Sequence, residues 1–310
     1  MRIFITGASG FIGSHVIRAL LKNSHTILAL VRKGNPAWRL HDIQGEFDTI
    51  QGHLNDRDLL HNELVKFHPE ACIHLAWYAR PGKYLYSENN ISCLFESIQL
   101  FELLRSAKCR KIVMAGTCAE YDTDFGYLTE GTPTNPATPY ASAKLSCYLV
   151  CQQLANSSDI DFTWGRIFFP FGPQENEGRL VPGAICSIIK NKRFNVTSGD
   201  HVRDFIFIED VAEAFCMLLE KESRGVYNIS TGMPITVRTL LESIESLMGH
   251  CEFLSFDTAQ QRSWDPPFIC GSNDKLKKLG WKPRHSINQG LLKTIEYWKE
   301  RLPYPNNLMR

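Results

Sequence analysis

Arg2-Ile3-Phe4-Ile5-Thr6-Gly7-Ala8-Ser9-Gly10-Phe11-Ile12-Gly13 is the stretch that decides the fold of this 310-residue chain. Its first five residues have the pattern of a buried strand, and residues 11–22 have the apolar spacing of an amphipathic helix. Gly7 permits a tight turn, Gly10 allows backbone to approach a pyrophosphate, and Gly13 allows helix and strand to pack closely. The free N–H groups at the helix start would face the phosphates. The stretch predicts a dinucleotide site at Gly7, Ser9, Gly10, Phe11, Ile12 and Gly13, with two residues between successive glycines.

The first half of the chain alternates short β-branched runs with longer helical patterns. Strands are predicted at residues 2–6, 26–31, 49–52, 71–75, 111–115 and 162–167. Helices are predicted at residues 11–22, 56–67, 89–106 and 138–155. Such alternation requires parallel strands joined by crossover helices. We therefore expect an α/β protein with a doubly wound parallel sheet, the Rossmann fold.

The alternation stops after Phe168, where several prolines and glycines form a loop. Short mixed elements follow, with helices predicted at residues 209–221 and from 287 to about 300. No repeat, low-complexity tract or flexible linker is found. We expect a dinucleotide-binding domain at residues 1–167 and a smaller lobe at residues 168–310, with some elements of the lobe returning to the first domain.

Composition and charge narrow the class of protein. Lys and Arg number 34 against 33 Asp and Glu, a net charge of +1, so no basic face for nucleic acid or an anionic membrane is expected. No stretch approaches the length of a membrane span. The chain opens on a strand pattern without a leader, and we expect a cytoplasmic protein. The ten cysteines are scattered and form no zinc-ligand set, so reduced thiols and no bound metal are expected.

The end of the second predicted strand indicates the cofactor. An NAD site usually has an Asp or Glu there, which accepts hydrogen bonds from the ribose 2′-hydroxyl. This chain has Arg32 and Lys33, which suit a 2′-phosphate. The sequence therefore favours NADP(H) and leaves NAD(H) open, and a solvated surface pair is the alternative interpretation.

Tyr140-Ala141-Ser142-Ala143-Lys144 is the second chemical signal. On a helix this spacing places the phenol and the ammonium on one face. A nearby cation lowers a phenol pKa toward neutrality, which suits a tyrosine that transfers protons. Thr117 ends a predicted parallel strand, where ligands bind in this fold class. We expect Thr117, Tyr140 and Lys144 to be the catalytic residues.

Taken together, these motifs resemble the extended short-chain dehydrogenase/reductase family of nucleotide-sugar epimerases, dehydratases and reductases. Further matches cover nearly the whole chain, including residues 74–76, 203–212, 227–230 and 279–283. The segments 203–211, 260–262 and 279–283 are similar to those of CDP-abequose and CDP-paratose synthases. The resemblance implies further cofactor contacts at Leu54, Leu75 and Ala76, beside Tyr140 and Lys144. It implies a substrate site formed by Trp77, Thr117, Phe169, Arg179, Arg203 and Arg262.

Some of these residues have a second interpretation. Arg203 and Arg262 would clamp the diphosphate of a nucleotide sugar, because a guanidinium binds phosphate oxygens in a bidentate manner, but either arginine alone suits a surface ion pair. Trp77 either walls the sugar pocket or belongs to the core. His74 either touches the cofactor or is a packed, hydrogen-bonded histidine.

The chain departs from the family pattern at three places. Gly52 is followed by His53, where an Asp usually holds the adenine amine. Phe169 follows Arg166-Ile167-Phe168 where many members have an Asn. Cys118-Ala119 stand where dehydratases have an Asp-Glu pair, and they supply neither an acid nor a base, so sugar 4,6-dehydration is not expected.

The function implied is NADPH-dependent reduction of a nucleotide-activated 4-keto-6-deoxysugar in deoxysugar biosynthesis. The first alternative is a nucleotide-sugar 4-epimerase with retained NAD. The second is a non-catalytic regulator that senses NADP. The nucleotide base and the sugar stereochemistry stay open.

A homodimer is also expected, because family members commonly pair through the helices predicted at 89–106 and 138–155. Both helices carry apolar residues beyond one face, namely Leu94, Phe95, Leu100, Phe101, Leu145, Tyr148 and Leu149. Burial of both faces within one chain is the alternative.

Overall fold

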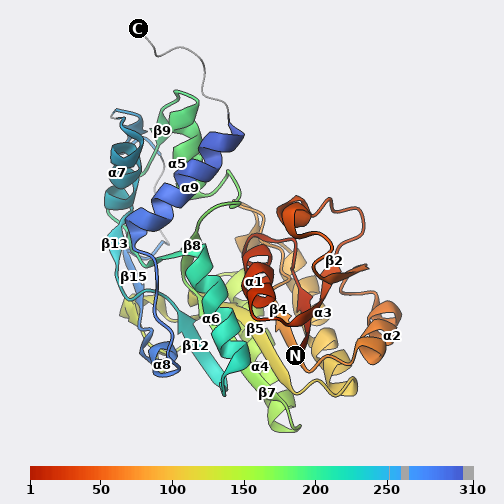
Figure 1. The fold of residues 1–310 in the computed structure, drawn as a ribbon. Coiled ribbons are helices and arrows are strands. Elements are labelled where there is room, and N and C mark those ends of the chain that lie inside the picture. The colour runs from red at the N-terminus through yellow and green to blue at the C-terminus, as the bar shows by residue number, and fades with distance from the viewer. Residues whose placement is uncertain (251, 260–264, 303–310) are drawn as a thin grey trace.

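A seven-stranded parallel sheet forms the centre of the computed structural model, which describes residues 1–250, 252–259 and 265–302 (Figure 1). Its strands are β1 (Arg2–Thr6), β2 (Thr26–Val31), β3 (Asp48–Gln51), β4 (Ala71–His74), β5 (Lys111–Thr117), β7 (Asp161–Ile167) and β12 (Gly225–Ile229). They lie in the order β12-β7-β5-β4-β1-β2-β3. Since the order reverses between β1 and β4, the crevice for ligands opens there, at the edge where the strands end. This edge is called the carboxyl edge below.

Helices cover both faces of the sheet. α1 (Phe11–Lys22) and α6 (Ile208–Glu220) pack together on one face, and α2 (Arg57–Phe67), α3 (Asn89–Ser106) and α4 (Pro139–Asn156) form the other layer (Figure 1). Alternation along β1 explains the two cores. Ile3 and Ile5 belong to the cluster that includes α1 and α6, whereas Phe4 belongs to the cluster that includes α3 and α4.

The remaining elements form a smaller lobe. Its helices are α5 (Leu180–Ile189), α7 (Val237–Met248), α8 (Asp274–Lys278) and α9 (Ile287–Arg301). One sheet has the order β13 (Ile235–Thr236), β10 (Val202–Arg203), β15 (Phe268–Gly271) and β6 (Tyr127–Leu128). Two strand pairs complete it, β11 (Phe205–Phe207) with β8 (Phe169–Phe171) and β14 (Leu254–Ser255) with β9 (Phe194–Asn195). Helices α5, α7 and α9 pack against one another (Figure 1).

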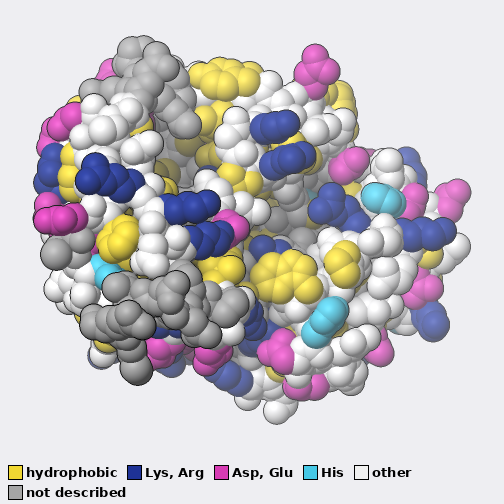
Figure 2. Space-filling model, turned by 90° about the horizontal axis from the view of Figure 1, so that it is seen from above, with side chains coloured by type: hydrophobic (Ala, Val, Ile, Leu, Met, Phe, Trp, Pro, Cys, Tyr) yellow, Lys and Arg dark blue, Asp and Glu magenta, His cyan; other side chains and the backbone are white. Residues whose placement is uncertain are grey.

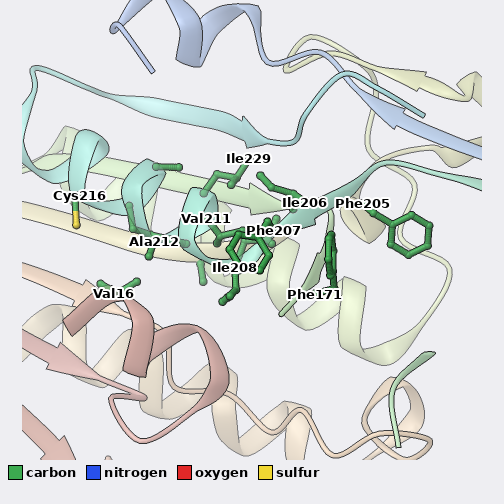
Figure 3. Close-up of a cluster of buried hydrophobic side chains, with 14 of the residues drawn as sticks. Val16, Phe171, Phe205, Ile206, Phe207, Ile208, Val211, Ala212, Cys216 and Ile229 are labelled. Carbon is green, nitrogen blue, oxygen red and sulfur yellow. The ribbon is translucent and has the colours of Figure 1, made fainter. Parts of the chain in front are cut away.

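A continuous hydrophobic cluster joins the lobe to the large sheet. Figure 3 shows Phe171 of β8 and Phe207 of β11 close to Val211 of α6 and Ile229 of β12, while Val16 of α1 lies at the far side of the cluster. All five side chains are buried. The lobe is therefore fixed to the sheet by shared core packing.

The predicted α/β class with a doubly wound parallel sheet is confirmed. The observed β5 extends past the predicted range 111–115 and ends at Thr117, the residue expected at the strand end, which places it on the carboxyl edge. The sequence analysis did not predict α5 or α7. For α7 the end signals are present, because Thr236 caps its start and Gly249 ends it in a left-handed conformation. Among the helices of the described residues, none has the length and apolar character needed to cross a membrane.

Candidate active site

The glycine loop has the close backbone approach that its spacing predicts. A Cβ on Gly13 would lie 2.1 Å from the carbonyl oxygen of Gly7, and one on Gly7 would lie 2.6 Å from the backbone of Leu75 and Ala76. Gly7 also has a φ of +73°, which favours glycine. The loop is therefore pressed between α1 and the end of β4. Ser9, Phe11 and Ile12, predicted with the glycines, lie in the same turn at the start of α1.

His74 is a packed, hydrogen-bonded histidine. One ring nitrogen lies 2.6 Å from the Thr6 hydroxyl and the other lies 2.8 Å from the Ser97 hydroxyl. Burial lowers the pKa of His74 to about 3, so the ring is neutral. The histidine thus ties β1, β4 and α3 together beneath the loop.

Basic side chains lie beside the glycine loop. Arg32 and Lys33 follow β2 and are exposed. Arg39, which the sequence reading missed, donates from Nη1 to the Ser9 carbonyl oxygen at 3.3 Å and from Nε to the Gln174 carbonyl oxygen at 2.9 Å. No motif marks Arg39, because it reaches the loop from a separate 3₁₀ helix, η1 (Trp38–Ile43). Three cations are therefore available near the loop for an anionic cofactor.

Thr117 and Tyr140 meet at the carboxyl edge. Thr117 lies at the end of β5 and Tyr140 in the first turn of α4, and the Thr117 side chain is close enough to lower the pKa of the Tyr140 phenol. The Tyr140 ring lies edge-on to Tyr84, with centroids 4.8 Å apart, and edge-on to Trp77 at 6.4 Å. Two aromatic rings, those of Tyr84 and Trp77, thus flank the phenol.

Lys144 lies one helical turn further along α4 and is buried. Its Nζ donates to the carbonyl oxygen of Ala115 at 2.7 Å and lies 3.9 Å from the centroid of the Trp77 ring. Burial lowers the pKa of Lys144 to about 8. The ammonium therefore lies under the site, between β5 and Trp77.

The structure corrects the expectation that Lys144 brings the Tyr140 pKa toward neutrality. Burial raises the pKa of Tyr140 well above its ordinary value, and Tyr84 raises it further, against the opposing effect of the hydrogen bond with Thr117. The ammonium is instead engaged by the Ala115 carbonyl and the Trp77 ring. Tyr140 is consequently protonated at neutral pH.

Trp77 is held as part of the site wall. Its Nε1 donates to Asn90 Oδ1 at 2.9 Å, and Asn90 Nδ2 donates to the carbonyl oxygen of Tyr84 at 2.7 Å. Asn90 itself is buried in the first turn of α3. One amide therefore fixes both aromatic residues that contact Tyr140.

The predicted substrate residues lie on two sides of the site. The Arg203 guanidinium lies 5.4 Å from the Phe169 ring centroid, and its Nη2 donates to Asp265 at 2.7 Å. Arg179 lies at the start of α5, 5.0 Å from the Tyr84 ring centroid. Arg262 lies outside the described residues. Figure 2 shows a hollow in the face seen from above, with Lys and Arg side chains on its borders.

The other predicted cofactor contacts lie close to the same edge. Leu75 and Ala76 follow β4 and touch Gly7. Leu54 follows β3, half-buried, and its carbonyl oxygen accepts a hydrogen bond from Gln99 of α3. All predicted site residues within the described ranges thus follow or adjoin the carboxyl ends of strands, apart from Arg179.

The sequence reading also missed Glu120, a fully buried carboxylate behind Thr117. It belongs to a capping box in which Thr117 and Glu120 close a 3₁₀ turn, η3 (Cys118–Glu120). The Thr-x-x-Glu spacing is the signal that could have found it. Glu120 forms an ion pair with Arg166 on β7.

The described part of the chain contains neither a group of side chains suited to a metal ion nor a disulfide. No group of three or more His, Cys, Asp or Glu side chains there could hold a metal ion. The nine described cysteines are free, and eight of them are buried, as expected for reduced core thiols.

Comparison with known proteins identifies the family. The sequence model of the NAD dependent epimerase/dehydratase family matches residues 3–230. CDP-abequose synthase of Salmonella typhimurium is 27% identical over 302 residues, covering 93% of this chain and 95% of the relative. UDP-glucose 4-epimerase of Mycolicibacterium smegmatis is 27% identical over 321 residues, covering 97% and 99%.

A solved structure shows the same fold. UDP-glucose 4-epimerase of Thermotoga maritima, determined with UDP-glucose, has a TM-score of 0.86 at 23% identity, covering 97% of this chain and 100% of that one. The family match, which spans the glycine loop, Thr117, Tyr140 and Lys144, places the chain in the NAD dependent epimerase/dehydratase family.

Proposed function

We propose that the protein reduces the 4-keto group of a nucleotide-activated 4-keto-6-deoxysugar with NADPH. The observation that carries this proposal is the protonated Tyr140 phenol beside Thr117 at the carboxyl edge. A carbonyl that accepts a hydride needs a proton on its oxygen, and Tyr140 is an acid held for that step. The similarity to CDP-abequose synthase supports the same substrate class.

The residues present fit a dinucleotide. The space between Gly7, Gly13 and the end of β4 excludes even a Cβ, so backbone N–H groups at the start of α1 can approach phosphates. When bound, the nicotinamide supplies the hydride. Arg32 and Lys33 would bind the 2′-phosphate, with Arg39 adding a third cation at Ser9. This basic set supports NADP(H) over NAD(H).

The three catalytic residues have separate tasks. Tyr140 Oη donates its proton to the carbonyl oxygen, and the Thr117 hydroxyl orients that oxygen. Lys144 holds a positive charge beneath the site, at the Ala115 carbonyl oxygen, and would bind the ribose of the cofactor. The proton lost from Tyr140 is regained from solvent before the next turnover.

The sugar nucleotide would lie between Trp77 and the lobe. Arg203 would bind its diphosphate, which requires release of Asp265, and Arg179 would approach from the start of α5. Arg262 is proposed as the second diphosphate ligand. Residues 1–167 would then bind cofactor and residues 168–310 the substrate. From the second segment, β12 joins the seven-stranded sheet and α6 packs against α1.

The test is cofactor stoichiometry. Purified protein is incubated with NADPH and nucleotide-linked 4-keto-6-deoxysugars, and NADPH oxidation is compared with loss of the ketone. The proposal predicts one NADPH oxidised per ketone reduced. Conversion of a nucleotide sugar to its 4-epimer without net NADPH loss would instead establish the epimerase, which the similarity to UDP-glucose 4-epimerases favours. Binding without any turnover would indicate the regulator.

A further inference from the structure

A buried carboxylate lies directly behind the catalytic threonine. Glu120 Oε1 accepts the backbone N–H of Thr117 at 2.8 Å and the Trp164 indole N–H at 3.0 Å. Its Oε2 accepts Arg166 Nε at 2.7 Å and the same indole N–H at 3.0 Å. Glu120 is 0% exposed, so bulk solvent does not reach these contacts.

The partners of Glu120 require its ionised form. Burial raises the pKa of this carboxyl, and Arg166, Thr117 and Trp164 offset part of that rise. Each of these three partners donates a hydrogen bond, and none can accept a proton from a neutral carboxyl. The side chain of Arg166 is also buried, so the two charges compensate each other in the same apolar space.

The residues around Glu120 leave room for its contacts with Thr117, Trp164 and Arg166. A Cβ on Gly116 would lie 2.1 Å from Trp164 Nε1 and 2.7 Å from Glu120 Oε1, so only glycine leaves room for both groups. The Arg166 guanidinium lies 4.1 Å from the Tyr121 ring centroid, and Tyr121 donates to Asn228 at 2.7 Å. The network thus extends from β5 through β7 to β12.

Glu120 is close enough to affect both ionisable catalytic groups. Its charge raises the pKa of Tyr140, alongside Tyr84 and Cys118. It also raises the pKa of Lys144, alongside Cys147 and Cys93, against the effect of burial.

We propose that Glu120 and Arg166 form a positioning pair for the reaction. Glu120 fixes the backbone of Thr117 and places a negative charge behind Tyr140 and Lys144, and the Arg166 guanidinium compensates that charge. The pair acts through Thr117, Tyr140 and Lys144 and touches no substrate. This inference rests on the proposed function for its kinetic consequences, although its electrostatic consequence does not.

The charge has a consequence of definite sign. Without the negative charge of Glu120, Lys144 loses its proton at lower pH, and Tyr140 ionises at lower pH. Both changes lower, at alkaline pH, the fraction of enzyme in which Tyr140 and Lys144 are protonated. The alkaline limb of the pH–rate profile therefore moves to lower pH in Glu120→Gln.

The kinetic test compares two substitutions at one position. Glu120→Gln should lower kcat up to about 100-fold, as for a reacting group displaced by about an ångström, and should shift the alkaline limb. Glu120→Asp keeps the charge but shortens the side chain, so kcat should fall while the limb stays in place. NADPH affinity should be unchanged in both at a pH low enough to keep Lys144 protonated, because Glu120 does not contact the glycine loop.

Asp210→Asn is the matched control. Asp210 is a buried carboxylate on α6, across the sheet from α4, and it accepts the backbone N–H of Arg284 and of His285. Its substitution should lower stability without moving the alkaline limb. If Glu120→Gln fails to fold, the double variant Glu120→Gln/Arg166→Gln removes both charges, and the limb should still move to lower pH.

A substrate-free measurement separates this inference from the proposed function. The Lys144 midpoint is followed by NMR of labelled lysine side chains and assigned with Lys144→Met. A lower midpoint in Glu120→Gln than in the wild type supports the pair, even if no ketosugar is reduced and the proposed function fails. An unchanged midpoint, together with wild-type kcat and an unmoved limb in an active enzyme, overturns it. An unchanged midpoint in an inactive protein overturns it equally.

Discussion

At Lys144, burial removes the water that would stabilise the ammonium, and the pKa falls to about 8. At Tyr140, burial disfavours the negatively charged phenolate, so the phenol keeps its proton. His74 is neutral because it too is buried. The protonation states at the carboxyl edge therefore follow first from packing and second from neighbouring charges.

Arg32 permits a residue-scale prediction about the cofactor. Arg32→Ala should weaken NADPH binding by about 10–100-fold, the value of one hydrogen bond to a charged group, and should leave NADH binding nearly unchanged. Fluorescence titration of both cofactors measures this, with Lys192→Ala of the second lobe as the control for general charge. Equal losses for NADPH and NADH would contradict the assignment.

The buried carboxyl of Glu175 makes the free energy of unfolding depend on pH. Its Oε2 has no hydrogen-bond partner within the described structure, and burial raises its pKa from 4.5 to about 8. Between these values the folded protein holds a proton that the unfolded chain has released. This carboxyl therefore lowers the free energy of unfolding by ~1.4 kcal/mol for each pH unit of rise in that window.

Glu175→Gln removes this titration. The variant should gain stability over the wild type as pH rises from 5 to about 8, by a few kcal/mol in total. Urea unfolding of both proteins across this range provides the measurement. A constant difference between them at every pH would show that Glu175 titrates normally.

At the scale of elements, the glycine loop between β1 and α1 permits a prediction about substitution of Gly13. Gly13→Ala places a Cβ where the Gly7 carbonyl oxygen lies, at 2.1 Å, and backbone cannot yield cheaply. Cofactor binding should be lost, and unfolding should cost about 1–3 kcal/mol less. Gly131→Ala, whose Cβ would meet only a Thr129 side chain at 3.8 Å, should change neither property. Retained NADPH affinity in Gly13→Ala would contradict the proposed loop.

How far the sequence predicts each element depends on the range of the interactions that form it. β1, α1 and α3 have the predicted bounds, because local apolar periodicity and flanking glycines determine them. The Tyr140–Lys144 spacing is likewise local. Glu120 and Arg166 lie 46 residues apart on different elements, so their pairing depends on strand order.

Two other features could not be derived from local pattern. Arg39 reaches Ser9 from a 3₁₀ turn whose position depends on the end of β2. The raised pKa of Tyr140 depends on Tyr84 and on the burial that the fold creates, neither of which the Tyr-x-x-x-Lys spacing contains.

At the scale of the whole molecule, the α3–α4 layer leaves apolar side chains uncovered. Phe95 is 66% exposed, Ile91 59% and Leu149 51%. Leu100 and Phe101, which the sequence also suggested for an interface, are buried within the chain. We propose that two copies pair through the exposed residues in an isologous interface.

The double variant Phe95→Asp/Leu149→Asp should therefore convert a dimer into a monomer, because it would bury four unpaired carboxylates in such an interface. Light scattering at micromolar concentration measures the mass. Leu292→Asp, at an exposed apolar position of α9, is the control and should stay dimeric. A wild-type monomer would contradict the dimer.

The most direct measurement is the single-turnover rate of NADPH oxidation by a nucleotide-linked 4-keto-6-deoxysugar in the wild type and in Tyr140→Phe. The phenylalanine keeps the ring against Tyr84 and Trp77 and removes only the acid. We expect the rate to fall by about 10²–10⁴-fold with NADPH affinity unchanged, since the glycine loop is intact. Turnover of Tyr140→Phe at the wild-type rate, with the same NADPH affinity, would contradict Tyr140 as the acid and the catalytic site built around it.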